Sequence, residues 1–168
     1  IGYFGINNNI ITDKYGSYVF IAYIVNNYDF EKDIPLDKTC LKCNKCVKAC
    51  PGNALLGNFE IDPRKCLSYI TQKKEELSEQ EEDALRKNKK VFGCDICQDI
   101  CPHNKNIEVT NFPQFKENLM TKIDIDEINE ISNKEFKRRY NNKAFSWRGR
   151  KLIKRNLDII YEENKINL

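Results

Sequence analysis

The sequence has very few of the residues on which most catalytic signatures depend. His103 is the only histidine, which excludes most catalytic triads, and no glycine-rich phosphate-binding loop is present. No window approaches the roughly 18 consecutive apolar residues that span a bilayer, and no basic segment precedes an apolar core as in a secretory signal. The sequence therefore predicts a protein that is not membrane-bound, that is located in the cytoplasm, and whose chemistry comes from a cofactor or a partner.

Methionine is as scarce as histidine. Met120 is the only one, so the 168 residues do not begin at a natural start, and we expect them to be a fragment or a processed product. The length allows one ordinary domain or two very small ones. With 40% hydrophobic and 32% charged residues, the chain is able to form a packed core.

Charge is nearly balanced overall but unevenly distributed. The formal net charge is +3, yet Lys134 to Arg155 holds ten basic residues and one acidic residue, whereas Glu75 to Asp83 holds six acidic residues and no basic one. The basic stretch has two interpretations, a solvated helix surface or a nucleic-acid contact. In the second, basic side chains neutralise phosphates and nearby aromatic side chains pack or stack. These side chains are Lys137, Arg138, Arg139, Arg148, Arg150, Lys151, Lys154 and Arg155, with Tyr140, Phe145 and Trp147.

Cysteine, in contrast, is abundant, and all eight cysteines lie between residues 39 and 102. Disulfides need an oxidising compartment, for which the sequence gives no sign. A zinc site built from the Cys40/Cys43 and Cys94/Cys97 pairs would leave the other four cysteines unexplained. The run Cys40–Pro51 instead has the bacterial-ferredoxin spacing C-x2-C-x2-C-x3-C-P, in which three thiolates curl around one [4Fe–4S] cubane and the fourth reaches the other cluster. Iron–sulfur clusters are therefore the favoured interpretation.

The second cluster motif is split. Cys94, Cys97 and Cys101 occupy its second, third and fourth positions, and the segment Ile61–Cys66 is typical of the one that introduces the first. We interpret residues 67–93 as an insertion between the first and second ligands. Because the fourth cysteine of each ferredoxin motif binds the other cluster, both ligand sets follow. The first cluster takes Cys40, Cys43, Cys46 and Cys101, and the second takes Cys50, Cys66, Cys94 and Cys97. All ligand places are then filled, so His103 is expected beside a cluster or on the surface and not as a ligand.

The sequence also predicts local structure around these motifs. Tyr18–Val25 is a continuous apolar run typical of a buried strand, and residues 55–61 are expected to form a small hairpin. Capping boxes that begin at Ser78, Asp124 and Ser132 predict three helix starts. A last helix is expected to carry an apolar face made of Leu152, Ile153, Leu157, Ile160 and Tyr161.

Four blocks of the sequence, taken in order, resemble the epoxyqueuosine reductase family. The first block is Gly2–Asn7 followed by Ile11–Ser17, and the second is the split cluster motif with Arg64–Tyr69. The third is Phe92–Pro102, and the fourth runs from Trp147 to Asn156. The resemblance covers nearly the whole chain, and the order of the blocks is more specific than any one of them.

The resemblance implies an α+β fold in three parts. Residues 1–30 would be the end of a cobalamin-binding α/β domain. Residues 31–112 would be a bacterial ferredoxin-like module with two [4Fe–4S] clusters and the insertion 67–93. Residues 113–168 would be the start of a helical, basic, tRNA-binding region, with most of the family's HEAT-like helical domain beyond them.

The resemblance also implies an enzyme, an oxidoreductase that reduces epoxyqueuosine to queuosine in tRNA. The two clusters would deliver electrons to cobalamin, and an external donor would supply those electrons to a monomeric protein. The proton donor is expected upstream of Ile1, so no catalytic residue is assigned in this chain, and we expect the chain alone to be inactive. Candidate cobalamin contacts are Asn7, Ser68, Tyr69 and Asp95. Candidate tRNA contacts are Arg148, Arg150, Lys151, Lys154 and Arg155.

Two other functions remain open from the sequence. One is a ferredoxin-type electron carrier without catalysis, although the basic tail and the cofactor-like amino-terminal loop count against it. The other is a corrinoid reductive dehalogenase, which combines a corrinoid with two clusters in the same way. Those enzymes are typically exported, and a basic, tRNA-like surface would have no purpose in them.

Overall fold

The chain forms two compact units from interleaved stretches of sequence, as seen in a computed structural model that describes residues 1–161. Unit 1 contains residues 1–50, 55–61 and 96–110, and unit 2 contains residues 51–54, 62–95 and those from 111 onward. Residues 162–168, the end of the third predicted region, lie outside the described residues. Within the described range, no helix has the length and apolar character needed to cross a membrane.

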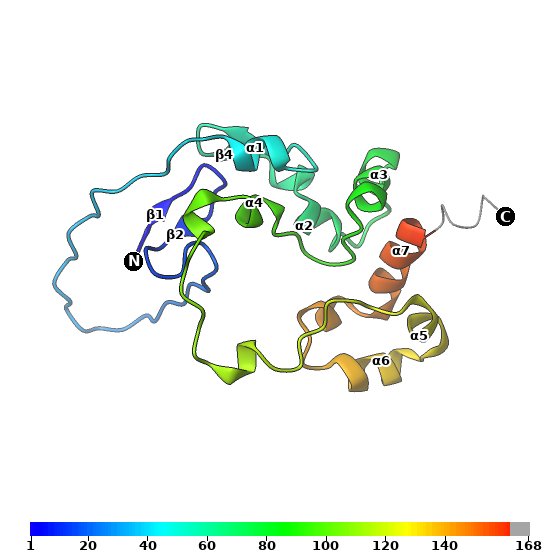
Figure 1. Cartoon of the computed structure of the whole chain (residues 1–168). Coiled ribbons are helices and arrows are strands. Elements are labelled where there is room, and N and C mark those ends of the chain that lie inside the picture. Colours follow the sequence, from blue (N-terminus) through cyan, green and yellow to red (C-terminus); the bar gives the residue numbers. More distant parts are fainter. Residues whose placement is uncertain (162–168) are drawn as a thin grey trace. The chain divides into compact units, whose positions relative to one another are not determined.

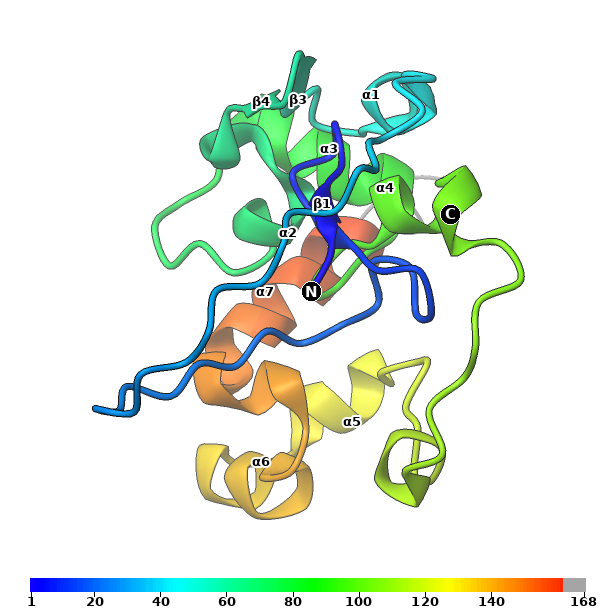
Figure 2. The ribbon, with the colours of Figure 1, turned by 90° about the vertical axis from the view of Figure 1, so that its left-hand side faces the viewer.

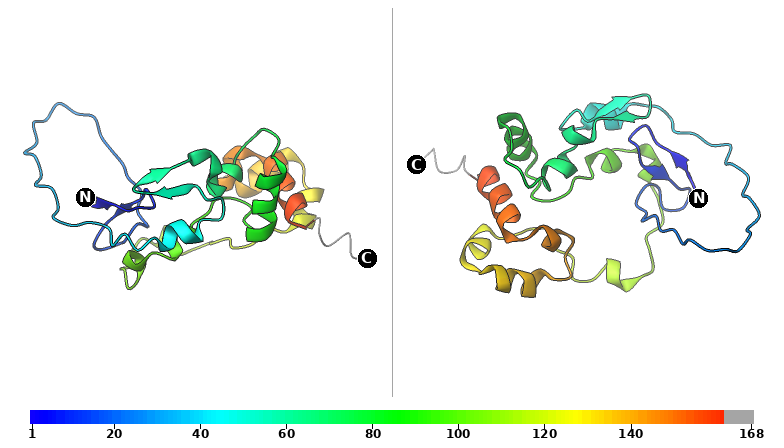
Figure 3. Two further views of the ribbon diagram at one scale, coloured as in Figure 1. Left: turned by 90° about the horizontal axis from the view of Figure 1, so that it is seen from above. Right: turned by 180° about the vertical axis from the view of Figure 1, so that it is seen from behind.

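Unit 1 contains two short hairpins. β1 (Tyr3–Phe4) pairs antiparallel with β2 (Ile10–Ile11), and β3 (Leu55–Gly57) pairs antiparallel with β4 (Glu60–Ile61). The second hairpin, drawn as two teal arrows in Figure 3, turns at Asn58 and Phe59, whose φ angles are 51° and 64°. Two positive φ angles in succession suit a tight two-residue turn. The hairpin predicted at residues 55–61 is therefore confirmed.

Two short helices pack against each other in unit 1 and position its cysteines. They are α1 (Lys45–Ala49) and α4 (Ile96–Asp99), and a 3₁₀ turn at Pro102–Asn104 follows the second. α1 ends just before Cys50 and Pro51, as predicted, because proline cannot continue a helix. The buried cluster of this unit combines Ile6 and Leu55 with cysteine side chains.

The predicted buried strand at Tyr18–Val25 is wrong for this structure. Residues 18–36 contain no helix or strand and run as an open loop (Figure 1), in which Phe20, Tyr23 and Val25 are 93%, 89% and 90% exposed. A stable strand needs a neighbouring strand for its backbone groups and a cover for its apolar side chains. Within the described part of the chain, no strand pairs with this segment.

Unit 2 is helical apart from its connecting loops. Ser78 and Glu81 form a reciprocal capping box at the start of α3, and the side chains of Asp124 and Ser132 accept backbone N–H groups at the starts of α5 and α6, so all three predicted helix starts are confirmed. The α-helices are α2 (Leu67–Ile70), α3 (Glu79–Asn88), α5 (Ile125–Glu130), α6 (Asn133–Tyr140) and α7 (Arg150–Tyr161), and the 3₁₀ helices are Pro63–Lys65, Pro113–Phe115 and Ala144–Arg148.

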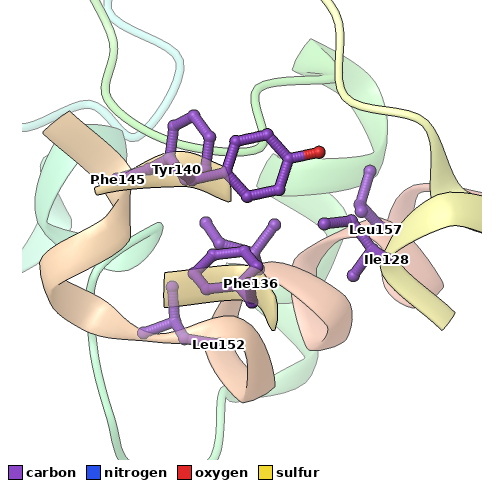
Figure 4. Close-up of a cluster of buried hydrophobic side chains, with 7 residues drawn as sticks. Ile128, Phe136, Tyr140, Phe145, Leu152 and Leu157 are labelled. Atoms are coloured by element: carbon purple, nitrogen blue, oxygen red, sulfur yellow. The ribbon is translucent and has the colours of Figure 1, made fainter. Parts of the chain in front are cut away.

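The last helix, α7, organises unit 2. It packs against α3, α5 and α6, and α5, α6 and α7 lie together in Figure 2. The predicted apolar face of α7 is buried except at Tyr161, which is 45% exposed, so the prediction is wrong at that residue. Tyr140 and Phe145 belong to the core, as their aromatic character suggested, together with Phe136 (Figure 4).

A polar contact at the edge of this core joins α5 to α6. The hydroxyl of Tyr140 donates to the Glu127 carboxylate at 2.7 Å, and Arg139 pairs with the same carboxylate at 2.6 Å. The Tyr140 hydrogen bond and the Arg139 charge hold the pKa of Glu127 below its ordinary value. Burial, with Glu127 nearby, raises the pKa of Tyr140 to about 12. The contact thus favours the ionised carboxylate of Glu127 and the protonated hydroxyl of Tyr140, which are the states that this hydrogen bond requires.

Candidate metal centre

The first three cysteines lie on a tightly curled loop of unit 1. Lys42 and Asn44 have positive φ angles of 50° and 57°, which turn the chain between Cys40 and Cys46. The helix α1 begins directly after Asn44. The backbone N–H of Lys42 donates to Cys40 Sγ at 3.4 Å. Hydrogen bonds from backbone amides to cysteine sulfur are among the contacts that tune iron–sulfur clusters. A backbone N–H group therefore points toward a cysteine sulfur at this position.

Cys101 lies beside this loop and lines the same pocket as its three cysteines. In the sequence, 50 residues separate it from Cys50, the last cysteine of the first motif. All four cysteines predicted for the first cluster line a single pocket. Three of them are buried, and Cys43 is exposed. The remaining lining residues are Ile6, Asn7, Ile11, Leu41, Pro102 and His103.

The electrostatic state of these thiols is consistent with a metal centre. Burial raises the pKa of the Cys46 thiol and of the Cys101 thiol, and neighbouring cysteines raise both further, while hydrogen bonds with the backbone at Val47 and His103 act in the opposite direction. The thiolate form therefore needs a compensating positive charge, which iron supplies. Four thiols that line one largely apolar pocket match the number of ligands that a [4Fe–4S] cluster needs, because each of its irons takes one cysteine.

The other four predicted ligands are divided between the two units. In unit 1, Cys50 follows α1 and Cys97 lies in α4, and both are partly buried against the apolar cluster of that unit. In unit 2, Cys66 directly precedes α2, and Cys94 packs against the cluster that contains Leu67. Their common binding of a second cluster stays a prediction.

The insertion at residues 67–93 is closed by hydrogen bonds inside unit 2. Thr71 Oγ1 accepts the N–H of Gly93 at 3.0 Å, so the residue before Cys94 is tied to the turn after α2. Asn156 of α7 is fully buried, and its Nδ2 donates to the carbonyl oxygens of Thr71 at 2.7 Å and Val91 at 2.8 Å. One side chain therefore joins both ends of the insertion. Sequence reasoning missed this role, and the only signal for it is the place of Asn156 in the fourth resemblance block.

The residues around Cys97 include one predicted site residue and one that sequence reasoning missed. Asn7, a candidate cobalamin contact, is 5% exposed, and its Nδ2 donates to the Cys97 carbonyl at 3.4 Å. Asn9 Nδ2 lies 3.9 Å from Cys97 Sγ as a hydrogen-bond donor. A short asparagine-rich turn before a strand carries no ligand signature, so the sequence could not assign Asn9. In this structure the β1–β2 turn thus contacts a cysteine of the split motif.

The other candidate cobalamin contacts lie in unit 2. The Ser68 carbonyl accepts hydrogen bonds from the Thr71 hydroxyl and the Gln72 amide. Tyr69 is 46% exposed, and Asp95 is also exposed. Their contact with cobalamin stays a prediction.

His103 has both ring nitrogens engaged by the protein. Nε2 accepts the backbone N–H of Leu41 at 3.3 Å, and Nδ1 lies 3.1 Å from the Tyr3 hydroxyl. The neutral tautomer with its proton on Nδ1 satisfies both contacts. His103 therefore lines the pocket and links β1 to the first cysteine loop.

The candidate tRNA contacts form two groups. Three of these side chains form hydrogen bonds or ion pairs with other groups of unit 2, and within residues 1–161 the other two do not. Arg150 Nε donates to the Ile131 carbonyl at 2.7 Å, and Arg155 donates to the carbonyls of Lys73 and Glu75 at 2.8 and 3.0 Å. Lys154 forms an ion pair with Asp158 at 2.9 Å. These contacts give the three residues a role within unit 2.

Lys151 and Arg148 differ from these three residues. Lys151 is exposed, and the Arg148 guanidinium lies 3.8 Å from the centre of the Trp147 ring. Trp147 itself is 65% exposed, unlike Tyr140 and Phe145, which belong to the core. The buried Nε of Arg148 has no hydrogen-bond partner within the described residues.

Comparison with known proteins agrees with this geometry. Residues 39–104 match a family described as a 4Fe-4S double cluster binding domain. An epoxyqueuosine reductase of Listeria monocytogenes is 38% identical over 166 residues, which cover 98% of this chain and 43% of that protein. The chain therefore spans less than half the length of this curated relative.

Solved structures of epoxyqueuosine reductases are also similar to this chain. The structure of epoxyqueuosine reductase from Bacillus subtilis, with its catalytic loop swung out of the active site, superposes with a TM-score of 0.87 at 34% identity, over 95% of this chain and 43% of that one. A crystal structure of an epoxyqueuosine reductase with an epoxyqueuosine-modified tRNA-Tyr stem loop superposes with a TM-score of 0.82 at 34% identity, over 93% of this chain and 41% of that one.

Proposed function

We propose that the chain, which is similar to epoxyqueuosine reductases over nearly its whole length, is the electron-delivering part of such an enzyme. In this proposal the full enzyme is an oxidoreductase that reduces epoxyqueuosine to queuosine in tRNA. The observation that carries it is the convergence of Cys40, Cys43, Cys46 and Cys101 on one pocket, inside a double-cluster domain. When bound, two [4Fe–4S] clusters supply one-electron chemistry and cobalamin supplies the reduction of the epoxide.

The chain's own residues hold and shield these groups. Cys40, Cys43, Cys46 and Cys101 bind the first cluster, and Cys50, Cys66, Cys94 and Cys97 bind the second. The Lys42 amide stabilises the Cys40 sulfur, and the Asn9 side chain does the same for Cys97. Apolar side chains such as Ile6 limit the access of water to the first cluster. Low access and amide hydrogen bonds together set the potential at which a cluster accepts an electron.

We propose the same three regions as above: residues 1–30, the cluster-binding residues 31–112 and the helical residues 113–168. Residues 1–30 would be the end of a cobalamin-binding domain and would pack against the rest of it. The exposed apolar residues between Phe20 and Val25 support this assignment, because a contiguous apolar segment is normally covered by another surface. Asn7, Ser68, Tyr69 and Asp95 are the proposed contacts with cobalamin.

The iron content of the chain tests the proposed function most directly. After anaerobic reconstitution we expect about eight iron and eight sulfide per chain, because two cubanes each hold four of both. Metal and acid-labile sulfide analysis measures this. Stoichiometric zinc without sulfide would contradict the proposal, and cobalamin binding to the full-length enzyme would distinguish a reductase from a simple electron carrier.

Binding to tRNA is proposed for the basic side chains that the fold leaves available. Replacing Arg148 and Lys151 by alanine should weaken binding of a tRNA anticodon stem loop and flatten its log–log salt dependence by roughly 1.4 to 1.8 units, since each lost phosphate contact contributes about 0.7 to 0.9. Fluorescence anisotropy at several salt concentrations measures the slope. Lys87→Ala on α3, an exposed lysine outside the basic stretch, is the control. An unchanged slope in the double variant would show that these side chains are only surface charge.

A further inference from the structure

A second feature of unit 1 lies outside the cysteine pocket. An open groove of about 520 Å³ is lined by residues from the first cysteine loop, α1 and the β3–β4 hairpin, which lie side by side in Figures 1 and 3. The groove residues are Ile6, Lys42, Asn44, Val47, Lys48, Leu56, Gly57, Asn58 and Phe59. None of them is acidic.

The groove has an apolar floor with a basic rim. Leu56 and Phe59 are 56% and 38% exposed, and Leu41 on the neighbouring loop is 65% exposed. Lys42 and Lys48 line the groove, and Lys42 Nζ lies 5.8 Å from the centre of the Phe59 ring. An apolar centre with charged residues around it is the usual composition of a protein-binding surface.

The lysines on this surface lie in a stretch of sequence that contains no acidic residue. Lys42, Lys45 and Lys48 are exposed, and none forms an ion pair within residues 1–161. From Lys38 to Phe59 the sequence contains no Asp or Glu, and Glu60 at the start of β4 is the first acidic residue beyond it. Some lysines elsewhere are paired with carboxylates, as Lys14 is with Glu108 and Lys73 with Glu81.

The same surface contains the most accessible ligand of the first cluster. Cys43 is exposed, whereas Cys40, Cys46 and Cys101 are 7%, 5% and 8% exposed. Cys43 lies between Lys42 and Lys45 in the sequence. An electron that enters the protein from outside must reach a cluster over a short distance, and Cys43 is where this ligand set comes nearest to solvent.

From these observations we propose that the surface formed by Leu41, Lys42, Lys45, Lys48, Leu56 and Phe59 is the docking site for an acidic electron-carrier protein of the flavodoxin or ferredoxin type. The inference rests on the proposed function, because it needs a cluster bound by Cys43. One electron leaves the carrier, for example from a flavin hydroquinone that becomes the semiquinone, and enters the cluster, whose core changes from 2+ to 1+. No bond is formed or broken.

Electrostatic attraction is what the unpaired lysines contribute to such an encounter. Complementary charge raises association rates by about 10 to 1000-fold at low ionic strength, and electron-transfer encounters are small and short-lived. RNA is a weaker fit to this surface, since nucleic-acid contacts typically use arginine forks and stacked bases, and this surface has neither arginine nor an aromatic residue other than the Lys42-covered Phe59.

The test uses the whole chain loaded with clusters and a reduced, acidic flavodoxin as the probe. Stopped-flow absorbance follows reduction of the clusters in the parent and in the Lys42→Glu/Lys45→Glu/Lys48→Glu variant. We expect the second-order rate of the variant to fall at least about tenfold at low salt, and its decrease with rising salt to disappear. A matched control, Lys74→Glu/Lys116→Glu/Lys122→Glu, makes the same change in net charge at exposed lysines and should keep a rate close to the parent's.

Three further arms complete the experiment. Reduced methyl viologen, a small cation, should reduce the variant at least as fast as the parent, which shows that its clusters are intact. Calorimetric titration with oxidised flavodoxin should show weaker binding to the variant without any turnover. If the glutamate variant does not hold clusters, the Lys42→Gln/Lys45→Gln/Lys48→Gln variant removes the charge with little change of shape and should show the same loss.

Each outcome bears on a different proposal. A loaded variant that accepts electrons from flavodoxin as fast as the control, with the same salt dependence, would overturn the docking site and leave the proposed function intact. Loss of tRNA stem-loop binding in the variant with an unchanged flavodoxin rate would assign the surface to RNA instead. A parent chain that contains no iron and sulfide would overturn both proposals.

Discussion

Replacing Cys101 by alanine is expected to remove the same cluster as replacing Cys40. Both side chains line one pocket, although 61 positions separate them in the sequence. Each single variant should hold about four iron instead of about eight, since a cubane that loses a ligand in a partly solvated pocket is not retained. The Cys40→Ala/Cys101→Ala double variant should lose no more iron than either single variant. Iron and sulfide analysis, with electron paramagnetic resonance of the reduced protein, measures both quantities.

Cys66→Ala is the matched comparison for this experiment. It removes a cysteine assigned to the second cluster, so its residual resonance signal should differ from that of Cys40→Ala, and combining the two changes should abolish iron binding. If Cys101→Ala and Cys66→Ala left identical residual clusters, the crossover would be wrong and the insertion would have been placed at the incorrect point of the second motif.

Replacing Asn156 by alanine is expected to destabilise unit 2 by about 2 to 4 kcal/mol, because it leaves two carbonyl oxygens without a donor and opens a small cavity. The carbonyls belong to Thr71 and Val91, and the amide is held in place because Arg155 donates to its Oδ1 at 2.9 Å. Urea unfolding followed by circular dichroism measures the change in free energy. Retention of iron should fall as well, since the two ends of the insertion carry Cys66 and Cys94.

Two variants separate loss of the donor from loss of volume. Asn156→Asp keeps the size of the side chain but cannot donate at neutral pH, so it should destabilise unit 2 at least as much as Asn156→Ala. Lys151→Ala, at an exposed position of the same helix, should change the free energy of unfolding by less than about 0.5 kcal/mol. A stability of Asn156→Ala within that range of the parent would contradict the role assigned to the buried amide.

Features that depend on neighbours in the sequence were predictable. The curl of the first cysteine loop follows from the spacing of Cys40, Cys43 and Cys46, and α1 ends before Pro51 because proline cannot continue a helix. The starts of α3, α5 and α6 follow from capping side chains that reach only three residues along the chain. Hydrophobic spacing likewise predicted the buried face of α7 as far as Ile160.

Features that depend on distant contacts were not predictable from composition and spacing. Lys151 and Arg155 are both basic residues of α7, yet one is exposed and the other donates to carbonyls some 80 positions away, a difference that only packing reveals. Trp147 points to solvent while Phe145, two residues earlier, is core. The apolar segment Tyr18–Val25 has the composition of a strand, but backbone pairing requires a neighbouring strand, and residues 1–161 do not provide one. Local chemistry thus encodes the cluster loop and the helix ends, and the motif spacing assigned Cys101 to the same cluster as Cys40. The packing of segments far apart in the chain is what brings these cysteines to one pocket and what closes the insertion through Asn156.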